Sequence, residues 1–242
     1  MMQDFNAIFD AALAENFPEL TVDGEKKERF RVLAEALTEK SAVMNLTAIT
    51  DLRGIVYKHF IDSFAPLEFI PQGANLLDVG AGAGFPSLPI AIMRPDVKVT
   101  SLDSTGKKLG FITYAAEKCG LDNVRVLNAR AEEAAILPQY REQFDAVTSR
   151  AVARLNVLCE LCIPFVRVGG VFLALKGADA DGEYTEAKNA FARLGCKIAR
   201  TEASVLRSND EHSARSVIVA EKTDATPSVY PRKYAAIKKA PL

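Results

Sequence analysis

A short apolar strand that breaks off at a cluster of glycines is the feature that most constrains this chain. Residues 75–86 read Asn-Leu-Leu-Asp-Val-Gly-Ala-Gly-Ala-Gly-Phe-Pro. Gly80, Gly82 and Gly84 lack the Cβ atoms that would block a tight turn and keep a ligand away from the backbone. Pro86 follows at a position where a helix can begin. Strand, glycine turn and helix together predict the first βα unit of a nucleotide-binding sheet.

Residues beside this turn indicate which nucleotide the unit binds. Asp103 ends the next apolar run about 20 residues later, where a carboxylate accepts hydrogen bonds from ribose hydroxyls. Phe85 stands where a dinucleotide fingerprint requires glycine or alanine. Asp78 would repel a pyrophosphate but attract the ammonium group of a methionine moiety, and the helix N-terminus suits its carboxylate. The pattern therefore favours S-adenosylmethionine, although alternate glycines also occur in ordinary tight turns.

The remaining apolar pattern predicts one α/β fold. Of the 242 residues 49% are hydrophobic and 25% are charged, which supports a real core and argues against disorder. Strands are predicted at 75–79, 97–102, 123–127, 144–148, 171–175, 197–206 and 216–220, and helices near 86–93, 105–119, 153–162 and 183–194. This alternation predicts a mostly parallel, Rossmann-like sheet of seven strands with helices on both faces. The last two strands lack a full helix between them, so we expect an antiparallel hairpin at the sheet edge.

The two ends of the chain differ from this central part. Apolar residues recur with a helical period in the first 70 residues, which predicts a helical extension over 1–70 before a Rossmann-like domain over 71–222. Residues 223–242 form a basic tail, and from Lys222 onward five bases stand against one acid. Such a tail, with its neighbouring tyrosines, could bind the phosphate backbone of a nucleic acid, but an ordinary solvated C-terminus has the same composition.

Several site classes are not expected. The four cysteines include one pair, Cys159-x-x-Cys162, inside a predicted helix, and only two histidines accompany them. A zinc site needs about four such ligands, so buried thiols and no metal are expected. No apolar run approaches the ~20 residues of a membrane span, and the acidic N-terminus lacks a signal-peptide pattern. We expect a cytoplasmic monomer without membrane contact.

Candidate site residues follow from the sheet, because its ligands lie beyond the carboxyl ends of the strands. Ala131 and Glu132 follow the third predicted strand and would meet an adenine edge, although Glu132 also suits an acidic first turn of a helix. Arg150 follows the fourth strand and Lys176 the fifth. Two cations there suit a phosphate-bearing substrate better than a neutral small molecule.

Motifs that are absent from the sequence limit which atom could accept a methyl group from S-adenosylmethionine. The fourth strand is followed by Thr148-Ser149-Arg150-Ala151 and not by the Asp/Asn-Pro-Pro-Tyr/Phe run that holds an exocyclic base amine. No cysteine occupies a pocket position, which argues against covalent attack on a pyrimidine ring. Methylation of the N7 atom of guanine needs neither this motif nor a cysteine nucleophile, because the lone pair of N7 is free. Catalysis would then consist of alignment and charge stabilisation.

These motifs, taken in order, resemble those of the glucose-inhibited division protein B family, the guanine-N7 methyltransferases of bacterial small-subunit ribosomal RNA. The resemblance covers essentially the whole chain. Its matching pieces are Asn45-Leu46-Thr47, Lys58-His59-Phe60 with Asp62-Ser63, the segment Leu77 to Pro86, Leu102-Asp103-Ser104, Lys107-Lys108, Arg130-Ala131-Glu132, Ser149-Arg150-Ala151, Lys176-Gly177 and Tyr230-Pro231-Arg232-Lys233. One departure is Ser87, where the family usually has glycine.

The resemblance implies a class I S-adenosylmethionine-dependent methyltransferase fold with a helical N-terminal extension. It also implies that the substrate is RNA in or near the small ribosomal subunit. Combined with the turn argument, the predicted cofactor residues are Asp78, Gly80, Gly82, Phe85, Asp103, Ala131, Glu132 and Arg150.

No single catalytic group stands out, and the candidates are Arg150, Asn45, His59 and Lys176. Asn45 could instead brace a loop, and His59 could lie between packed helices. Two other functions share the expected fold: a nicotinamide-dependent oxidoreductase, disfavoured by Phe85 and Asp78, and an RNA-binding protein without activity.

Overall fold

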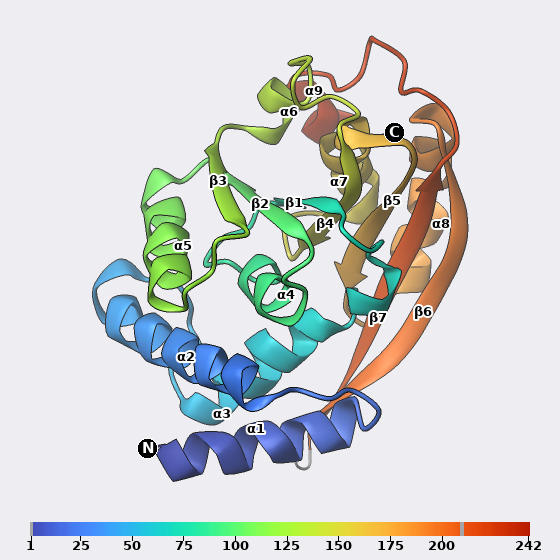
Figure 1. Ribbon diagram of the computed structural model, residues 1–242. Coiled ribbons are helices and arrows are strands. Elements are labelled where there is room, and N and C mark those ends of the chain that lie inside the picture. Colours follow the sequence, from blue (N-terminus) through green and yellow to red (C-terminus); the bar gives the residue numbers. More distant parts are fainter. Residues whose placement is uncertain (1, 209–210) are drawn as a thin grey trace.

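The computed structural model describes residues 2–208 and 211–242 and contains one seven-stranded sheet (Figure 1). The strands are β1 (Asn75–Val79), β2 (Lys98–Asp103), β3 (Val124–Asn128), β4 (Phe144–Arg150), β5 (Val166–Lys176), β6 (Cys196–Ser208) and β7 (Glu211–Lys222). Their order is β3-β2-β1-β4-β5-β7-β6, with β1 to β5 parallel and β7 antiparallel to both β5 and β6. The predicted parallel sheet and its antiparallel edge hairpin are confirmed.

Helices precede the sheet and then alternate with its strands. The first group is α1 (Met2–Asn16), α2 (Gly24–Met44), α3 (Leu52–Gly54) and the short turns η1 (Ile55–Phe60), η2 (Ile61–Phe64) and η3 (Leu67–Phe69). The second is α4 (Ser87–Met93), α5 (Gly106–Lys118), α6 (Ala131–Ala134), α7 (Leu155–Cys162), η4 (Ile163–Phe165), α8 (Ala180–Arg193) and α9 (Tyr234–Lys239). Helix α9 was not among the predicted elements.

Side chains of neighbouring strand residues enter two separate cores. Leu76, on β1, packs in a core with residues of α1, α2, α4 and α5, whereas Leu77 packs in a second core with residues of α6 to α9. Successive side chains of a strand point to opposite faces, so the buried run of β1 requires cover on both sides. Figure 1 shows α4 and α5 on one side of the sheet and α7 and α8 on the other. The N-terminal helices therefore share one core with the sheet.

Asn16, the last residue of α1, joins the first helix to the end of the hairpin. Its side-chain amide donates to the carbonyl of Arg207 at 3.0 Å, and its side-chain oxygen accepts from the Arg207 N–H at 2.8 Å. Arg207 belongs to β6, the last strand of the sheet. The side chain of Asn16 thus makes the two hydrogen bonds that the backbone of a further strand would make with Arg207.

The segment after β7 is docked rather than free. Lys222 is buried and bonded to Glu142 at 3.1 Å and to the carbonyls of Ile163 and Val166. Its partners lie where β4 and β5 begin, so the segment is anchored at the amino edge of the sheet, opposite the glycine turn. The prediction that all five bases from Lys222 onward belong to one solvated or RNA-binding tail is therefore wrong for Lys222, which ends β7 and is buried.

A second anchor holds α9. Arg232 binds the fully buried carboxylate of Glu160 on α7, with Nη2 to Oε2 at 2.6 Å and Nε to Oε1 at 2.9 Å. Ile237 of α9 is buried in the core beneath the helix. Lys233, Lys238 and Lys239 remain exposed.

Candidate cofactor and substrate site

The turn after β1 is tied to the neighbouring strand. The N–H groups of Gly80 and Ala81 both donate to the carbonyl of Leu102, at 2.8 and 3.0 Å. Gly80 has a φ of 73°, in the left-handed region that side chains disfavour. A Cβ at this residue would lie 2.4 Å from a methyl group of Val152. The turn therefore requires glycine here for its conformation and for space.

Asp103 stands at the end of β2 and helps to shape the same turn. One carboxylate oxygen accepts from the N–H of Gly82 at 3.0 Å, and the other accepts from the N–H of Thr105 at 2.8 Å. A carboxylate oxygen has two lone pairs, so each still has acceptor capacity for a hydroxyl. The carboxylate is thus fixed in place beside the turn before any ligand arrives, as a ribose-binding acid should be.

Asp78 is buried and bonded within the protein. Its side chain is buried, and its carboxylate accepts from the N–H of Ser87 at 3.2 Å and from the hydroxyl of Thr148 at 3.3 Å. Burial raises its pKa to about 6, against the opposing effect of its contacts with Ser87. The carboxylate thus joins β1 to β4 and to the start of α4.

A cavity of about 680 Å³ opens beside the turn, at the carboxyl edge of the sheet. Val152 lines the cavity and also lies against Gly80, so it separates the cavity from the turn. The charged lining residues are five bases, Lys58, Arg150, Arg154, Lys176 and Arg215, and two acids, Asp62 and Glu183. The excess of positive charge favours an anionic ligand.

The two predicted cations of this cavity each have an acidic partner. Arg150 binds Asp62 at 2.8 Å, and Lys176 binds Glu183 at 2.7 Å and the carbonyl of Ala153 at 2.8 Å. Both residues were predicted to be cations available to a phosphate. Lys176 is instead largely a structural link, since its side chain is 8% exposed and joins the segment after β4 to α8.

His59, which lines the cavity, stacks on the buried ring of Phe85 behind it. The rings of His59 and Phe85 are 4.5 Å apart and nearly parallel, and the guanidinium of Arg150 lies 5.8 Å from the Phe85 ring. The Nε2 atom of His59 is 2.8 Å from the hydroxyl of Thr47. Burial and the nearby Arg150 lower the pKa of His59 to about 4, so its ring is neutral at pH 7. The structure brings these three predicted residues together.

The other predicted residues lie apart from this stack. Asn45 is exposed, ends α2 in a left-handed conformation with a φ of 48°, and is not among the residues that line the cavity. This geometry matches the alternative in which Asn45 braces a loop. Ala131 is buried and Glu132 half-buried in the first turn of α6, directly after β3 and the neighbouring loop.

Sequence reasoning gave no role to Asp62, Val152 or Arg215, all of which line the cavity. Arg215 lies on β7 beside Ser216, which pairs with Lys176 at the end of β5. An antiparallel strand enters the sheet at the edge where parallel strands end, so its first residues reach the same site as their carboxyl ends. That topological signal was available once the hairpin was predicted.

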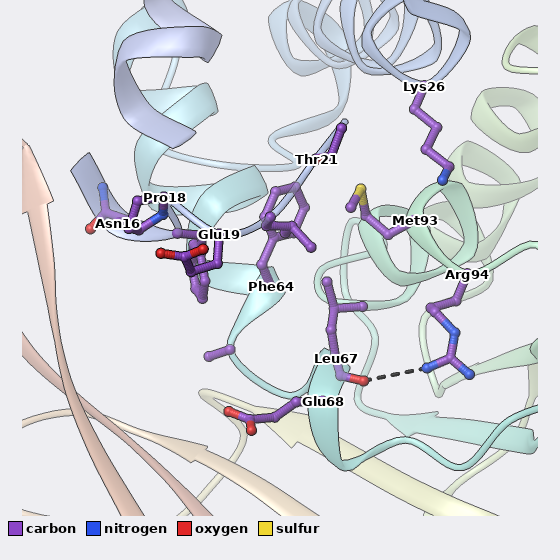
Figure 2. Close-up of a pocket in the computed structure, with 13 residues that line it drawn as sticks. Asn16, Pro18, Glu19, Thr21, Lys26, Phe64, Leu67, Glu68, Met93 and Arg94 are labelled. Carbon is purple, nitrogen blue, oxygen red and sulfur yellow. Dashed lines mark hydrogen bonds between the residues drawn. The ribbon is translucent and has the colours of Figure 1, made fainter. Parts of the chain in front are cut away.

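A second cavity, of about 570 Å³, lies between the α1–α2 connection and α4 (Figure 2). Phe64, Leu67 and Met93 form its apolar wall, and Arg94 beside them donates to the carbonyl of Leu67 at 3.4 Å. None of the predicted site residues lines this cavity. It is therefore separate from the site at the carboxyl edge.

The thiols are buried, and burial raises the pKa of each of the four cysteines. Across residues 2–208 and 211–242, no cluster of three His, Cys, Asp or Glu side chains could hold a metal ion. The same described residues include no helix with the length and hydropathy needed to cross a bilayer.

Comparisons with known proteins agree on a family and on a fold. The family described as GidB, rRNA small subunit methyltransferase G, matches residues 26–213. A relative from Lactobacillus delbrueckii subsp. bulgaricus, named ribosomal RNA small subunit methyltransferase G, is 45% identical over 90% of this chain and 92% of its own. A protein of the same name from Brevibacillus brevis is 42% identical over 92% of this chain and 94% of its own.

Among solved structures, the [4+2]-cyclase SpnF aligns with a TM-score of 0.57 at 13% identity, over 84% of this chain and 98% of its own. The structure of M. jannaschii TYW2 in complex with AdoMet aligns with a TM-score of 0.52 at 13% identity, over 85% and 80% of the two chains. At these identities the likeness concerns the fold alone.

Proposed function

Because the chain belongs to the rRNA small subunit methyltransferase G family, we propose that it transfers a methyl group from S-adenosylmethionine to the N7 atom of a guanine in 16S ribosomal RNA. The fold is that of the class I S-adenosylmethionine-dependent methyltransferases. The single observation that best supports the substrate class is the cavity beside the glycine turn, where five bases stand against two acids. RNA is the polyanion that such a wall attracts.

The residues around the turn suit the cofactor. We assign the ribose to Asp103, the close backbone approach to Gly80 and Gly82, and the adenine edge to Ala131 and Glu132. Asp78 acts indirectly, by fixing the start of α4 through the N–H of Ser87. Arg150 lines the cavity and lies 5.8 Å from the ring of Phe85, so we assign these two residues to the boundary of cofactor and base.

When bound, S-adenosylmethionine supplies an electrophilic methyl group. Guanine N7 has a free lone pair, so no side chain has to remove a proton from it. The neutral His59 ring fits this requirement, because it offers a flat stacking face and not an acid. The contribution of the chain is then to orient the base toward the methyl group and to exclude water.

The function is tested by methyl transfer. Labelled S-adenosylmethionine is incubated with the protein and with 30S particles that lack the modification, and the labelled base is then mapped. We expect label on the N7 of a single guanine. Label on an exocyclic amine or a ribose hydroxyl would contradict the proposed chemistry, and cofactor-independent RNA binding without transfer would support a purely RNA-binding protein.

Asp103→Ala is expected to weaken cofactor binding by roughly 1–3 kcal/mol, because charge-assisted hydrogen bonds to the ribose are lost. Calorimetry with S-adenosylhomocysteine measures this change directly. Asp122→Ala is the matched control. This exposed acid precedes β3 and therefore lies at the amino edge of the sheet, opposite the glycine turn. Equal affinity of wild type and Asp103→Ala would remove Asp103 from the cofactor site.

Arg150→Ala is expected to reduce both cofactor affinity and methyl transfer, since Arg150 lies at the boundary of the two ligands. Loss of one charged hydrogen-bonding group corresponds to roughly 10–100-fold in kcat/KM. The measurement is single-turnover transfer to 30S particles, with cofactor affinity determined separately. Transfer at the wild-type rate would show that Arg150 has no part in the chemistry.

A further inference from the structure

One carboxylate in the cavity binds two arginines. Asp62, on η2, accepts from Nη1 of Arg150 at 2.8 Å through one oxygen and from Nε of Arg215 at 2.7 Å through the other. The Asp62 side chain is 11% exposed, and those of Arg150 and Arg215 are 15% and 30% exposed. A single negative charge thus holds two positive charges in one place at the cavity wall.

Both guanidinium groups have donors left over. Each has five N–H groups in a rigid plane. Besides Asp62, Arg150 donates from Nη1 to the carbonyl of Lys58, and Arg215 from Nη1 to the carbonyl of Ala214. In the part of the chain that the structure describes, no hydrogen bond joins Nη2 of either arginine to another protein group. Paired planar donors of this kind match the oxygens of a phosphate.

We propose that Arg150 and Arg215 form a binding site for one phosphodiester group of the RNA, and that Asp62 is the positioning residue that orients both arginines. The inference rests on the proposed function, because it names the part of the RNA that this cavity holds. Arg215 comes from β7, two strands away from β4, which carries Arg150. The phosphate would therefore be held between the ends of β4 and β7, across the end of β5.

A different explanation of the same residues is a diffuse positive field with no fixed geometry. The two explanations make opposite predictions for Asp62→Asn. Removal of a negative charge from a diffuse basic surface strengthens RNA binding. If Asp62 instead orients two arginines, the variant weakens binding in spite of its extra positive charge.

The experiment measures KM and kcat for undermethylated 30S particles, cofactor affinity by calorimetry, and RNA affinity as a function of salt. For Asp62→Asn we expect KM for the particle to rise by about tenfold, because this factor corresponds to the loss of one charge-assisted hydrogen bond. Glu186→Gln is the matched control. Glu186 is paired with Arg154 at the rim of the same cavity at 2.8 Å, so the variant makes the same charge change without touching Asp62. It should leave KM unchanged or lower.

Two variants of Arg215 keep the test decisive even if Asp62→Asn folds poorly. Arg215→Gln should reduce the slope of log affinity against log salt by about 1, as for one lost phosphate contact. Arg215→Lys keeps the charge but loses the planar donors. Its slope of log affinity against log salt should therefore equal that of wild type, whereas its KM should remain raised. Cofactor affinity should stay within about threefold of wild type in both, because a lost direct contact would cost more than this.

An unchanged or lowered KM in both Asp62→Asn and Arg215→Lys would overturn the phosphate site. The proposed function would be untouched by that result, since it depends on the base that wild type labels. Conversely, wild type that labels another atom would contradict the proposed function, while the salt slopes would still decide whether Arg215 contacts a phosphate.

Discussion

Replacement of Gly80 by valine is expected to abolish binding of S-adenosylmethionine and S-adenosylhomocysteine. The φ of 73° at this residue is unfavourable for any β-branched side chain. The added Cβ would also lie 2.4 Å from Val152, so the turn or the segment after β4 must move. Because the same turn is bonded to Leu102 and Asp103, its displacement also disturbs Asp103, the acid that we propose to bind the ribose. Calorimetry should detect no binding.

Gly73→Ala separates this effect from general backbone strain. Gly73 also has a positive φ, 67°, but a Cβ there would meet nothing within 4 Å, and the residue precedes β1 at the opposite edge of the sheet. It should lose about 1–2 kcal/mol of folding stability and bind the cofactor normally. Full cofactor affinity in a folded Gly80→Val protein would refute the assignment of this turn to the cofactor.

Arg232→Ala is expected to lower the free energy of unfolding by about 3–5 kcal/mol, because it leaves a buried charge without its partner. The Glu160 carboxylate is fully buried, and the Arg232 side chain provides two of the shortest contacts to it. The docking of α9 on α7 depends on this pair. Denaturant unfolding followed by circular dichroism measures the change.

Two comparisons identify the cause of that loss. Arg167→Ala breaks an exposed pair with Asp145 at 2.6 Å and should cost less than about 1 kcal/mol, as is typical of surface ion pairs. The double variant Glu160→Leu, Arg232→Met removes both charges and should recover most of the stability. If Arg232→Ala is as stable as Arg167→Ala, the pair contributes little to the fold.

Hydrophobic periodicity was sufficient to predict the sheet. Each predicted strand overlaps an observed one, because a buried parallel strand reads as a short apolar run between turn residues. The positions of the glycine turn and of Asp103 could be predicted for a related reason. Both lie within one βαβ unit, so residues close together in the sequence determine how they meet.

Roles that depend on distant pairing could not be predicted in this way. Arg215 and Asp62 are 153 residues apart, and Arg232 and Glu160 are 72 apart. A charge in a sequence indicates solvent exposure unless its partner is known, so Arg232 and Lys222 were counted as parts of a basic tail. The contacts of Asp78 with Ser87 and Thr148 also form only in the folded sheet, so the sequence did not indicate them.

The Asn16 contact covers part of the edge of the sheet. An edge strand exposes N–H and C=O groups that can pair with the edge of another molecule and start aggregation. At the hairpin end, Asn16 occupies both groups of Arg207. The opposite edge, β3, is only five residues long and carries the exposed charge of Arg125. Displacement of α1 would therefore uncover these two groups at the end of β6 and make them available for edge-to-edge pairing.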